Sequence, residues 1–287
     1  MRPGERGTAA EQLANLRRAV SALQPLLDER ALVITHGNGP QVGNELLRQE
    51  RAADEAPALP LWLAVAQTQA EIGALIVAEL HPTLADRPIA CVLTHVRVAA
   101  DDPAFDRPTK PIGPFYSQAQ AEELERDRGW RIVADAGRGH RRVVPSPQPR
   151  EIVELDPIRT LLDAGVLAVA CGGGGIPVVA RDGQLRGIDA VIDKDRASAL
   201  LATALGAERL VILTAADAVY RDFGGPGQEA IDALDADHAE ALLPALPEGS
   251  MRPKVEAAVS FVRATGGEAL ITSPAALGEG GGTRITR

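Results

Sequence analysis

Two lysines of this chain have unusual neighbours. Lys194 lies between Asp193 and Asp195, directly before a predicted helix, so two carboxylates can orient its ammonium group. Lys254 follows the segment Gly249-Ser-Met-Arg-Pro253 at a predicted helix N-terminus, where its charge adds to the unpaired backbone N–H groups. Fixed positive charge of this kind suits phosphoryl transfer, which needs positioning and charge neutralisation more than covalent help.

A third lysine, Lys110, stands in the proline-framed segment Pro108-Thr-Lys-Pro-Ile-Gly-Pro114. Lysine is scarce in the chain, so three lysines in such settings favour one common site. Taken singly, each could instead be a solvated surface residue, with Asp195 serving only as the N-cap of its helix.

Two glycine turns follow short apolar runs that predict buried strands. Gly37-Asn-Gly39 comes after residues 32–34, and Gly172-Gly-Gly-Gly175 comes after residues 166–171. Glycine lets the backbone turn sharply and approach a ligand closely. Four consecutive glycines are costly in conformational entropy, which favours a ligand contact over a plain turn. The second turn matches neither the Walker A pattern nor the dinucleotide fingerprint.

The composition excludes several classes of protein. The chain has 287 residues, a formal net charge of −9 and two cysteines. The acidic balance argues against a nucleic-acid or anionic-membrane surface, and no apolar run approaches the roughly 18 residues of a membrane span. The histidines lack metal-ligand spacing, and His36 is best explained as a turn cap. We expect a cytoplasmic protein without a secretion signal, a disulfide framework or a metal site of its own.

Apolar residues spaced three and four apart predict helices, and short apolar runs predict buried strands. Helices are expected over 13–27, from 41, over 61–80, over 118–128, from 197 and from 253, and strands over 32–35, 89–98, 166–171, 210–213 and 269–272. This alternation predicts a mostly parallel sheet with helices on both faces. Both glycine turns then fall at the carboxyl ends of strands, where such sheets bind ligands.

The composition changes between residues 106 and 150, where prolines frame a polar segment with one predicted helix. Such a segment adds little to a central sheet. We expect an inserted subdomain, or lid, that protrudes from a single domain spanning residues 1–287. A long surface excursion without function is the alternative.

Five blocks of sequence together resemble the carbamate kinase family of the amino acid kinase superfamily. They are Val33-Ile-Thr-His-Gly-Asn-Gly-Pro-Gln-Val-Gly43, Pro108-Thr-Lys-Pro-Ile-Gly-Pro114, Cys171-Gly-Gly-Gly-Gly-Ile-Pro177, Ala190-Val-Ile-Asp-Lys-Asp195 and Gly249-Ser-Met-Arg-Pro-Lys254. The similarity runs in order along nearly the whole chain.

The resemblance implies a three-layer α/β/α sandwich with a mostly parallel central sheet and a small protruding subdomain, assembled as a homodimer. It implies reversible phosphoryl transfer between ATP and carbamate, giving ADP and carbamoyl phosphate, with Mg²⁺ carried by the nucleotide. In the family the reaction often runs toward ATP, at the end of arginine or purine-derived catabolism.

The family's site residues carry over by matching position. Lys194 and Lys254 match lysines that hold the transferring phosphoryl group and the nucleotide phosphates, Asp193 and Asp195 match the aspartates beside the first of these, and Lys110 matches the lysine that reaches the carbamoyl group. The matches to the substrate and phosphate loops are Gly37, Asn38, Gly39, Gln41, Gly172, Gly173 and Gly174, and those to the nucleotide site are Thr214, Tyr220 and Met251.

Three departures bear on this prediction. The family begins with a strand and a Gly-Gly-Asn-Ala-Leu loop, and this sequence begins where that loop would end. We therefore expect a sheet that lacks one central strand and an active site that lacks part of its floor. We also expect Met1 to be an internal methionine of a longer product. The family's Glu-Thr-Gln-Gly block is Gln67-Thr-Gln-Ala70 here. Its Leu-Thr-Asp-Val block is Leu213-Thr-Ala-Ala216, which removes a carboxylate near the nucleotide, and Arg252 replaces a glycine.

Two other functions remain open on the sequence. The altered loops suit a kinase for a different small carboxylate or carbamate, and they also suit a non-catalytic nucleotide-binding homologue. The three retained lysines favour an active enzyme, whereas Ala215 and the absent loop favour loss of activity.

Overall fold

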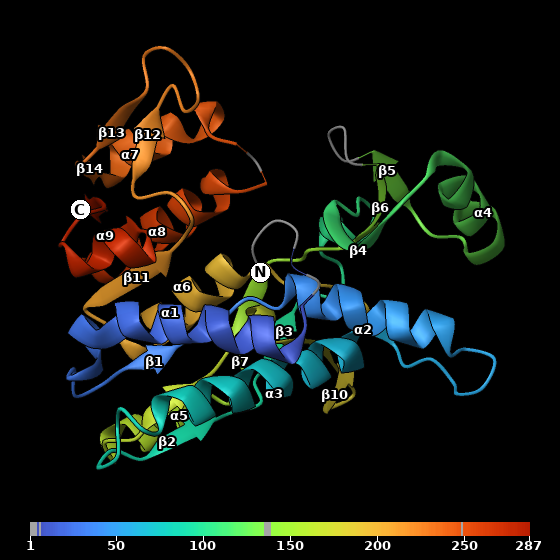
Figure 1. Cartoon of the computed structure of the whole chain (residues 1–287), viewed down its shortest axis with the longest axis horizontal. Helices are drawn as coiled ribbons and strands as arrows, with labels where there is room; N and C mark the ends of the chain where they lie inside the picture. Colours follow the sequence, from blue (N-terminus) through green and yellow to red (C-terminus); the bar gives the residue numbers. More distant parts are fainter. Residues whose placement is uncertain (1–4, 6, 135–138, 248) are drawn as a thin grey trace.

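The computed structural model describes residues 5, 7–134, 139–247 and 249–287. A layered main body carries a small subdomain at one side, with β4, β5, β6 and α4 at the upper right of Figure 1. The main body carries the predicted site residues except Lys110, which lies on β4 (Lys110–Tyr116) of the subdomain.

The strands that precede the two glycine turns lie side by side. β8 (Leu167–Val169) pairs in parallel with β1 (Val33–Ile34) on one edge and with β2 (Ile89–Cys91) on the other. Ile34 lies opposite Val169. The chain therefore leaves β1 and β8 at the same level of the sheet, as parallel pairing of the predicted strands requires.

A second group of strands follows the first along the chain and forms a sheet of four strands. β3 (His95–Val98) pairs in parallel with β9 (Ile176–Arg181), while β7 (Pro149–Ile152) and β10 (Gln184–Gly187) add antiparallel strands at the edges. The sequence predicted one strand over 89–98. The structure divides it between β2 and β3, and the buried Thr94 lies at the break.

A third group of strands belongs to the C-terminal half. β11 (Arg209–Leu213) is parallel to β15 (Glu268–Thr272), which is antiparallel to β16 (Thr283–Thr286), and β16 is parallel to β14 (Ala233–Asp235). The hairpin of β12 (Val219–Arg221) and β13 (Glu229–Ile231) lies beside this group. Within the described ranges, no strand pairs with the second edge of β1 or of β11. The absence of a central strand from the sequence stays a prediction.

Helices cover both faces of the sheet. In the main body they are α1 (Ala9–Leu27), α2 (Gly39–Arg51), α3 (Leu61–Leu80), α5 (Leu155–Asp163), α6 (Lys194–Leu205), α7 (Ala236–Leu242), α8 (Met251–Thr265) and α9 (Pro274–Gly278). Leu167 and Val169 of β8 pack against α1 and α3, whereas Ala168 and Ala170 pack against α5 and α6. Successive side chains of a strand point to opposite faces, so the predicted three layers are confirmed.

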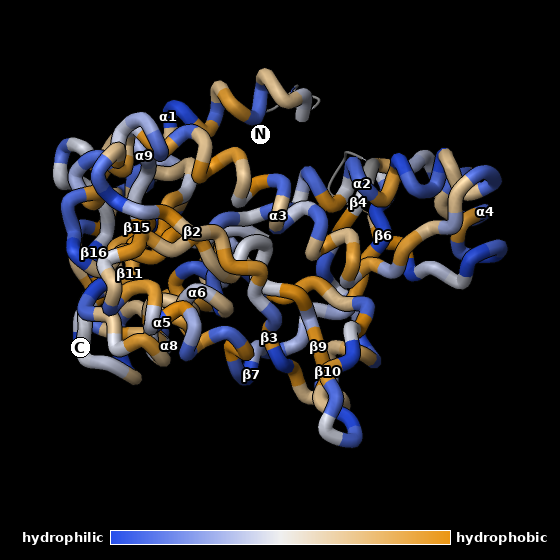
Figure 2. The backbone as a smooth tube through the Cα atoms, turned by 90° about the horizontal axis from the view of Figure 1, so that it is seen from below, coloured by the Kyte–Doolittle hydropathy of each residue, from blue (hydrophilic) through white to orange (hydrophobic). Residues whose placement is uncertain are grey.

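Helix α3 is the one helix of the described ranges that is long and apolar enough to cross a membrane by length and composition alone. Here it packs along α1 and α2 and buries Ile72, Ile76 and Leu80 against the sheet. Hydrophobic residues also gather along β11 and β15 inside the main body (Figure 2). The length and bounds predicted for α3 are confirmed, and its place is at the core of a layered protein.

The subdomain has a small sheet of its own, which the sequence did not predict. β4 (Lys110–Tyr116), β6 (His140–Val144) and β5 (Ile132–Ala134) are antiparallel in the order β4-β6-β5, and α4 (Gln118–Arg128) lies beside them. Apolar side chains of β4 and β6 pack on α2 and α3 at the base, and the rest protrudes (Figures 1 and 2). The predicted helix over 118–128 is confirmed.

Candidate active site

The two glycine turns meet at the ends of β1 and β8. We call Gly37–Gly39 the first glycine turn and Gly172–Gly175 the tetraglycine turn. The pairing of the strands continues into both turns, because Ala170 N donates to Ile34 O (3.0 Å) and Gly173 N donates to His36 O (2.6 Å). Parallel pairing thus joins two turns that are far apart in the sequence.

Close packing explains why the tetraglycine turn consists of glycine. A Cβ on Gly172 would lie 2.2 Å from His36 Nε2, and one on Gly173 would lie 2.1 Å from the Asn38 amide. Gly174 has a φ of +92°, and a Cβ there would lie 2.3 Å from Ile192 O. Sequence reasoning attributed these glycines to contact with a ligand. The structure adds a different reason, since groups of the protein itself fill the space of each absent side chain.

Three of the four N–H groups of the tetraglycine turn are already used within the protein. Those of Gly173, Gly174 and Gly175 donate to backbone carbonyls of His36, Cys171 and Gly172 at 2.6, 3.1 and 3.1 Å. In the first glycine turn, by contrast, Asn38 is the N-cap of α2 and makes no side-chain cap bond within the described residues. The start of α2 can therefore offer N–H groups to an anion.

His36 lies between the two turns. Its Nδ1 is 3.2 Å from Gly37 O, and burial lowers the pKa of the imidazole, partly offset by this contact. The ring is therefore neutral at pH 7, with Nδ1–H donating to the carbonyl and Nε2 facing Gly172. This agrees with a turn-capping role.

The three lysines are joined by two aspartates. Lys110 Nζ lies 2.9 Å from Asp193 Oδ2, while Lys194 Nζ and Lys254 Nζ lie 2.5 and 2.9 Å from the two carboxylate oxygens of Asp195. We call these five residues the lysine array. They include all the lysines of the sequence. The structure thus gathers three isolated sequence features into one charged site.

Three elements position the lysine array. α6 begins at Lys194, and its N-cap is Asp193, whose Oδ1 accepts from Asp195 N (2.9 Å) and Arg196 N (3.4 Å). The suggestion that Asp195 is the cap is therefore wrong. Because Asp193 caps the helix, the carboxylate of Asp195 is left to bond lysines from α6 and α8, and Lys110 arrives from β4 in the subdomain.

The electrostatics of the lysine array leave one surplus positive charge, from three ammonium groups and two carboxylates. Burial acts to raise the pKa of Asp193, but the charge and hydrogen bond of Lys110 and the N–H groups of Arg196 and Asp195 outweigh it, so the pKa lies below its ordinary value. The side chains of Lys110 and Lys194 remain 36% and 39% exposed. An anion can therefore reach ammonium groups that are already fixed in place.

The lysine array touches the first glycine turn. A Cβ on Gly37 would meet Lys194 Cδ at 3.1 Å, so the stem of Lys194 lies directly over the turn. Thr35, which precedes the turn, bonds to Ser198 of α6 at 2.8 Å. The end of β1, the first glycine turn and the positive charge thus form one continuous surface.

Comparison with known proteins agrees with this geometry. The sequence model of the amino acid kinase family matches residues 5–273. The carbamate kinase of Lentilactobacillus hilgardii is 45% identical, over 97% of this chain and 92% of that protein. Carbamate kinase 3 of Staphylococcus aureus is 46% identical, over 94% and 90%. This chain belongs to the amino acid kinase family, among the carbamate kinases.

The fold of the family is also the fold of this chain. The carbamate kinase of Giardia lamblia bound to AMP-PNP superposes with a TM-score of 0.91 at 36% identity, covering 100% of this chain and 94% of that one. A structure from Aeropyrum pernix superposes equally well, with a TM-score of 0.91, 42% identity and coverage of 99% and 95%. The predicted amino acid kinase architecture is confirmed.

The predicted nucleotide-binding residues lie on the C-terminal half of this carbamate kinase fold. Thr214 follows β11, Tyr220 lies on β12, and Met251 is the first residue of α8, one turn before Lys254. The Tyr220 ring is 5.8 Å from that of Phe223. Met251 shares helix α8 with Lys254 of the lysine array, and the role of all three positions in nucleotide binding stays a prediction.

Two of the predicted substrate residues have other partners. Asn38 is 3% exposed and its amide donates to Thr68 Oγ1 at 3.0 Å, and Gln41 Nε2 donates to Gln12 Oε1 of α1 at 2.9 Å. Gly39 has open space where a Cβ would be. A substrate at the first glycine turn would therefore meet backbone more than these two side chains.

Sequence reasoning named Thr68 and Gln69 only as part of an altered loop, whereas the structure places them on α3, where they bond to the two glycine turns. It missed Thr94, which bonds to Cys171, directly before the tetraglycine turn. One signal was available. Thr68 and Gln69 are polar residues at helical positions that share a face with the apolar Ala64, Val65 and Ile72. Polar side chains on a buried helix face need protein partners, and these partners are the turns.

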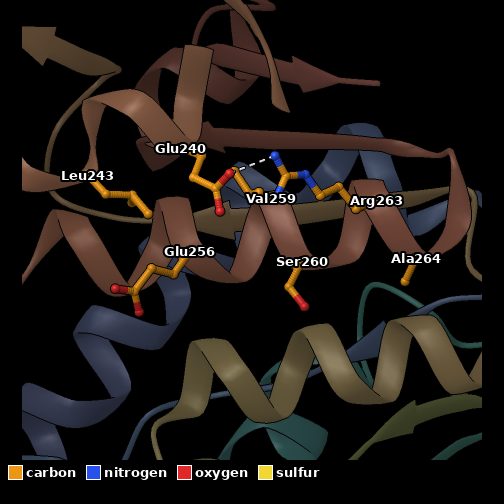
Figure 3. A pocket seen from close by; sticks show the side chains of 7 residues that line it. All are labelled: Glu240, Leu243, Glu256, Val259, Ser260, Arg263 and Ala264. Atoms are coloured by element: carbon orange, nitrogen blue, oxygen red, sulfur yellow. Dashed lines mark hydrogen bonds and ion pairs between the residues drawn. The ribbon is translucent and has the colours of Figure 1, made fainter. Parts of the chain in front are cut away.

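A pocket of about 550 Å³ on the surface of α8 lies outside the lysine array. Figure 3 shows it beside α7, where Glu240 forms an ion pair with Arg263 at 2.7 Å. Another lining residue, Glu256, is paired with Arg196 of α6 at 3.0 Å. Its charged groups have partners of their own, and it includes none of the predicted site residues.

Within the part of the chain that the structure describes, the side chains form no cluster of metal ligands. Groups of three or more His, Cys, Asp or Glu residues placed to hold an ion do not occur there. Asp193 and Asp195, the carboxylates nearest the site, are bonded to lysines.

Proposed function

We propose that this chain transfers a phosphoryl group reversibly between carbamoyl phosphate and ADP, giving carbamate and ATP. The observation that carries the proposal is the convergence of all three lysines of the chain, through two aspartates, beside the first glycine turn. The names of the relatives support the choice of carbamate as the acceptor, and the AMP-PNP-bound relative supports ATP as the nucleotide.

Lys194 and Lys254 act on the transferring group. Their ammonium groups, held by Asp195, neutralise the equatorial oxygens of the phosphoryl group as it passes between ADP and carbamate. Because they are positioned before substrate arrives, little reorganisation is needed in the transition state. A phosphoryl transfer of this loose kind needs no covalent intermediate on the protein.

Lys110 acts from the subdomain. Its ion pair with Asp193 joins residues 83 positions apart in sequence and connects the base of the subdomain to the lysine array. We propose that the segment 106–150 is a lid, and that Lys110 exchanges Asp193 for the carbamoyl group when substrate binds. The lid also excludes water from the reacting phosphoryl group.

The nucleotide and its metal ion fit the charge of the site. The surplus positive charge of the lysine array matches nucleotide phosphates, while both carboxylates are occupied by lysines. We therefore propose that Mg²⁺ arrives on the phosphates of ATP or ADP. There it neutralises charge between the β- and γ-phosphates.

We propose that two copies of the chain form a homodimer through α3 and β2. A groove of about 700 Å³ is lined by Ala74, Val77, Ala78, His81, Ile89 and Cys91. Among the described strands β2 pairs only with β8, and an open edge next to an apolar helix face is a surface that proteins normally cover. In a twofold arrangement two β2 strands would lie edge to edge.

The dimer is tested by Ala78→Arg, with Ala119→Arg, at an exposed position on α4 of the subdomain, as the matched control. Light scattering should give two chains for the wild type and the control, and one chain for Ala78→Arg. A monomeric wild type, or a dimeric Ala78→Arg, would contradict the proposed surface.

We further propose that the protein acts in the cytoplasm, in arginine or purine-derived catabolism. Its two free cysteines suit a reducing compartment.

The proposed function is tested by ATP formation from ADP, Mg²⁺ and carbamoyl phosphate. Lys194→Ala should lower the rate by at least about 10²-fold while the thermal unfolding curve stays near that of the wild type. Nucleotide binding without turnover in the wild type would favour a non-catalytic homologue. Turnover with another acyl phosphate, but not with carbamoyl phosphate, would favour a kinase for a different small carboxylate.

A further inference from the structure

Two adjacent polar residues of α3 lie on its buried side. Thr68 and Gln69 are each 1% exposed and share that side of the helix with Ala64, Val65 and Ile72. An apolar side chain would fill either position without needing a hydrogen-bond partner. The partners of Thr68 and Gln69 therefore show what the polar groups do.

Gln69 bonds to the tetraglycine turn and to Thr94, which lies at the break between β2 and β3. Its Oε1 accepts from Thr94 N at 2.6 Å, and its Nε2 donates to Gly172 O at 2.8 Å and to Thr94 O at 3.4 Å. Thr94 completes the connection, because its Oγ1 accepts from Cys171 N at 3.0 Å and its carbonyl accepts from Ile176 N at 2.8 Å. The carbonyl of Gly172 is thus fixed to the break between β2 and β3.

Thr68 bonds to the first glycine turn in the same way. Its Oγ1 accepts from Asn38 Nδ2 at 3.0 Å, while its own proton is directed to Ala64 O, 2.9 Å away. The Asn38 amide in turn lies where a Cβ of Gly173 would be. Consecutive residues of one helix therefore hold the two glycine turns in a fixed relation.

We propose that Gln69 is a positioning residue for phosphoryl transfer, which sets the tetraglycine turn against the first glycine turn and Lys194. This inference rests on the proposed function. Reacting groups must be aligned closely, and a displacement of about 1 Å can cost about 10²-fold in rate. Without the Gln69 amide, Gly172 O and Thr94 N would both lose their bonds to α3. The tetraglycine turn would then be held by its backbone bonds alone, and its position relative to Lys194 would be less closely fixed.

Gln69→Glu tests this role because the new side chain can be switched by pH. As a carboxylate it still accepts from Thr94 N but repels Gly172 O; as a carboxylic acid it donates to Gly172 O and restores the bond. Burial raises the pKa of such a carboxyl group into the range of the assay. Ile72→Val, a buried change one turn further along α3, is the control for a general loss of stability.

We expect kcat for ATP formation in Gln69→Glu to fall by roughly 10²-fold at about pH 8, with the KM for ADP unchanged. At about pH 6 the reduction in kcat should be about tenfold or less, because the protonated side chain again donates to Gly172 O. Ile72→Val should have the pH profile of the wild type. A loss that is independent of pH, or one that Ile72→Val reproduces, would overturn the positioning role.

Hydrogen exchange separates this inference from the proposed function. The peptide that spans residues 170–177 should exchange faster in Gln69→Glu than in the wild type near pH 8, whether or not the protein makes ATP. If exchange is faster in Gln69→Glu but the wild type does not use carbamoyl phosphate, then the proposed function is wrong and the structural role of Gln69 still holds. An active wild type with unchanged exchange and kinetics in Gln69→Glu would refute the positioning role itself.

Discussion

Replacing Asp195 with asparagine tests the lysine array most directly. The substitution keeps the shape of the side chain and removes the charge that Lys194 and Lys254 share. The carboxylate is 7% exposed, and its oxygens lie 2.5 and 2.9 Å from the two ammonium groups. In the variant both lysines face a neutral amide, and their mutual repulsion is no longer balanced.

The expected loss in the free energy of unfolding of Asp195→Asn follows from the exposure of the two lysines. Removing one partner of a buried ion pair costs about 3–5 kcal/mol. Lys194 is 39% exposed, whereas Lys254 is 13% exposed, so water replaces much of the lost interaction for the first lysine but little for the second. We expect a loss of about 2–3 kcal/mol in the free energy of unfolding, which lowers Tm by about 4–10 °C. Turnover should fall by about 10²–10³-fold.

Thermal unfolding with and without ligand is the assay. ADP or inorganic phosphate should recover part of the lost stability of Asp195→Asn, because bound phosphate oxygens take the place of the carboxylate. An amine-directed reagent followed by mass spectrometry gives a second measure. The sequence has three lysines, all in the array, so side-chain labelling reports on this site alone, and ADP should protect it.

Asp237→Asn is the matched control. Asp237 pairs with Arg263 at 2.8 Å but is 91% exposed, so its loss should change the free energy of unfolding by less than about 0.5 kcal/mol. If Asp195→Asn matched this control in stability and retained wild-type turnover, the claim that Asp195 organises the site would be refuted.

Three further predictions use the same structure. Lys110→Ala should raise the KM for carbamoyl phosphate while leaving the Kd of ADP unchanged, since Lys110 comes from the subdomain; equal losses for both ligands would count against its role. The lowered pKa of Asp193 gives stability that is present above about pH 4 and is lost as pH falls through the folded-state value. Urea unfolding should therefore show the advantage of the wild type over Asp193→Asn shrinking toward about pH 3, and a growing advantage would contradict this. Gly173→Ala meets Asn38 at 2.1 Å, whereas Gly183→Ala, also at positive φ, meets nothing within 4 Å. The first variant should be less stable than the second by about 1–3 kcal/mol, and equal losses would remove the packing argument.

Local patterns in the sequence predicted the elements well where one signal dominated. The bounds predicted for α3 and α4 agree with the structure, in which Ser117 caps α4 by accepting from Gln120 N. The sequence failed where a long-range contact decided the local structure. The run over 89–98 reads as one strand, yet Thr94 interrupts it because its N–H, carbonyl and hydroxyl groups bind Gln69, Ile176 and Cys171.

The helix start at Lys194 shows the same division. The pattern Asp193-Lys-Asp195 predicted the N-terminus of a helix, but either aspartate was a chemically suitable N-cap. In the structure the N-cap is Asp193, whose Oδ1 accepts from the N–H groups of Asp195 and Arg196. That choice decides the function of the other carboxylate, because only an Asp195 that is not capping α6 can bond both Lys194 and Lys254.

The sequence by itself determined the residue types, the helices and buried strands with strong apolar patterns, and the glycine turns that end two of the strands. These depend on apolar spacing and on the backbone freedom of single residues, which are local properties. Only the tertiary structure decided that Lys110 meets Asp193 across 83 positions, and that Gln69 holds Gly172. Contacts of this kind depend on which side-chain atoms face one another across packed layers, and no spacing along the chain encodes that geometry.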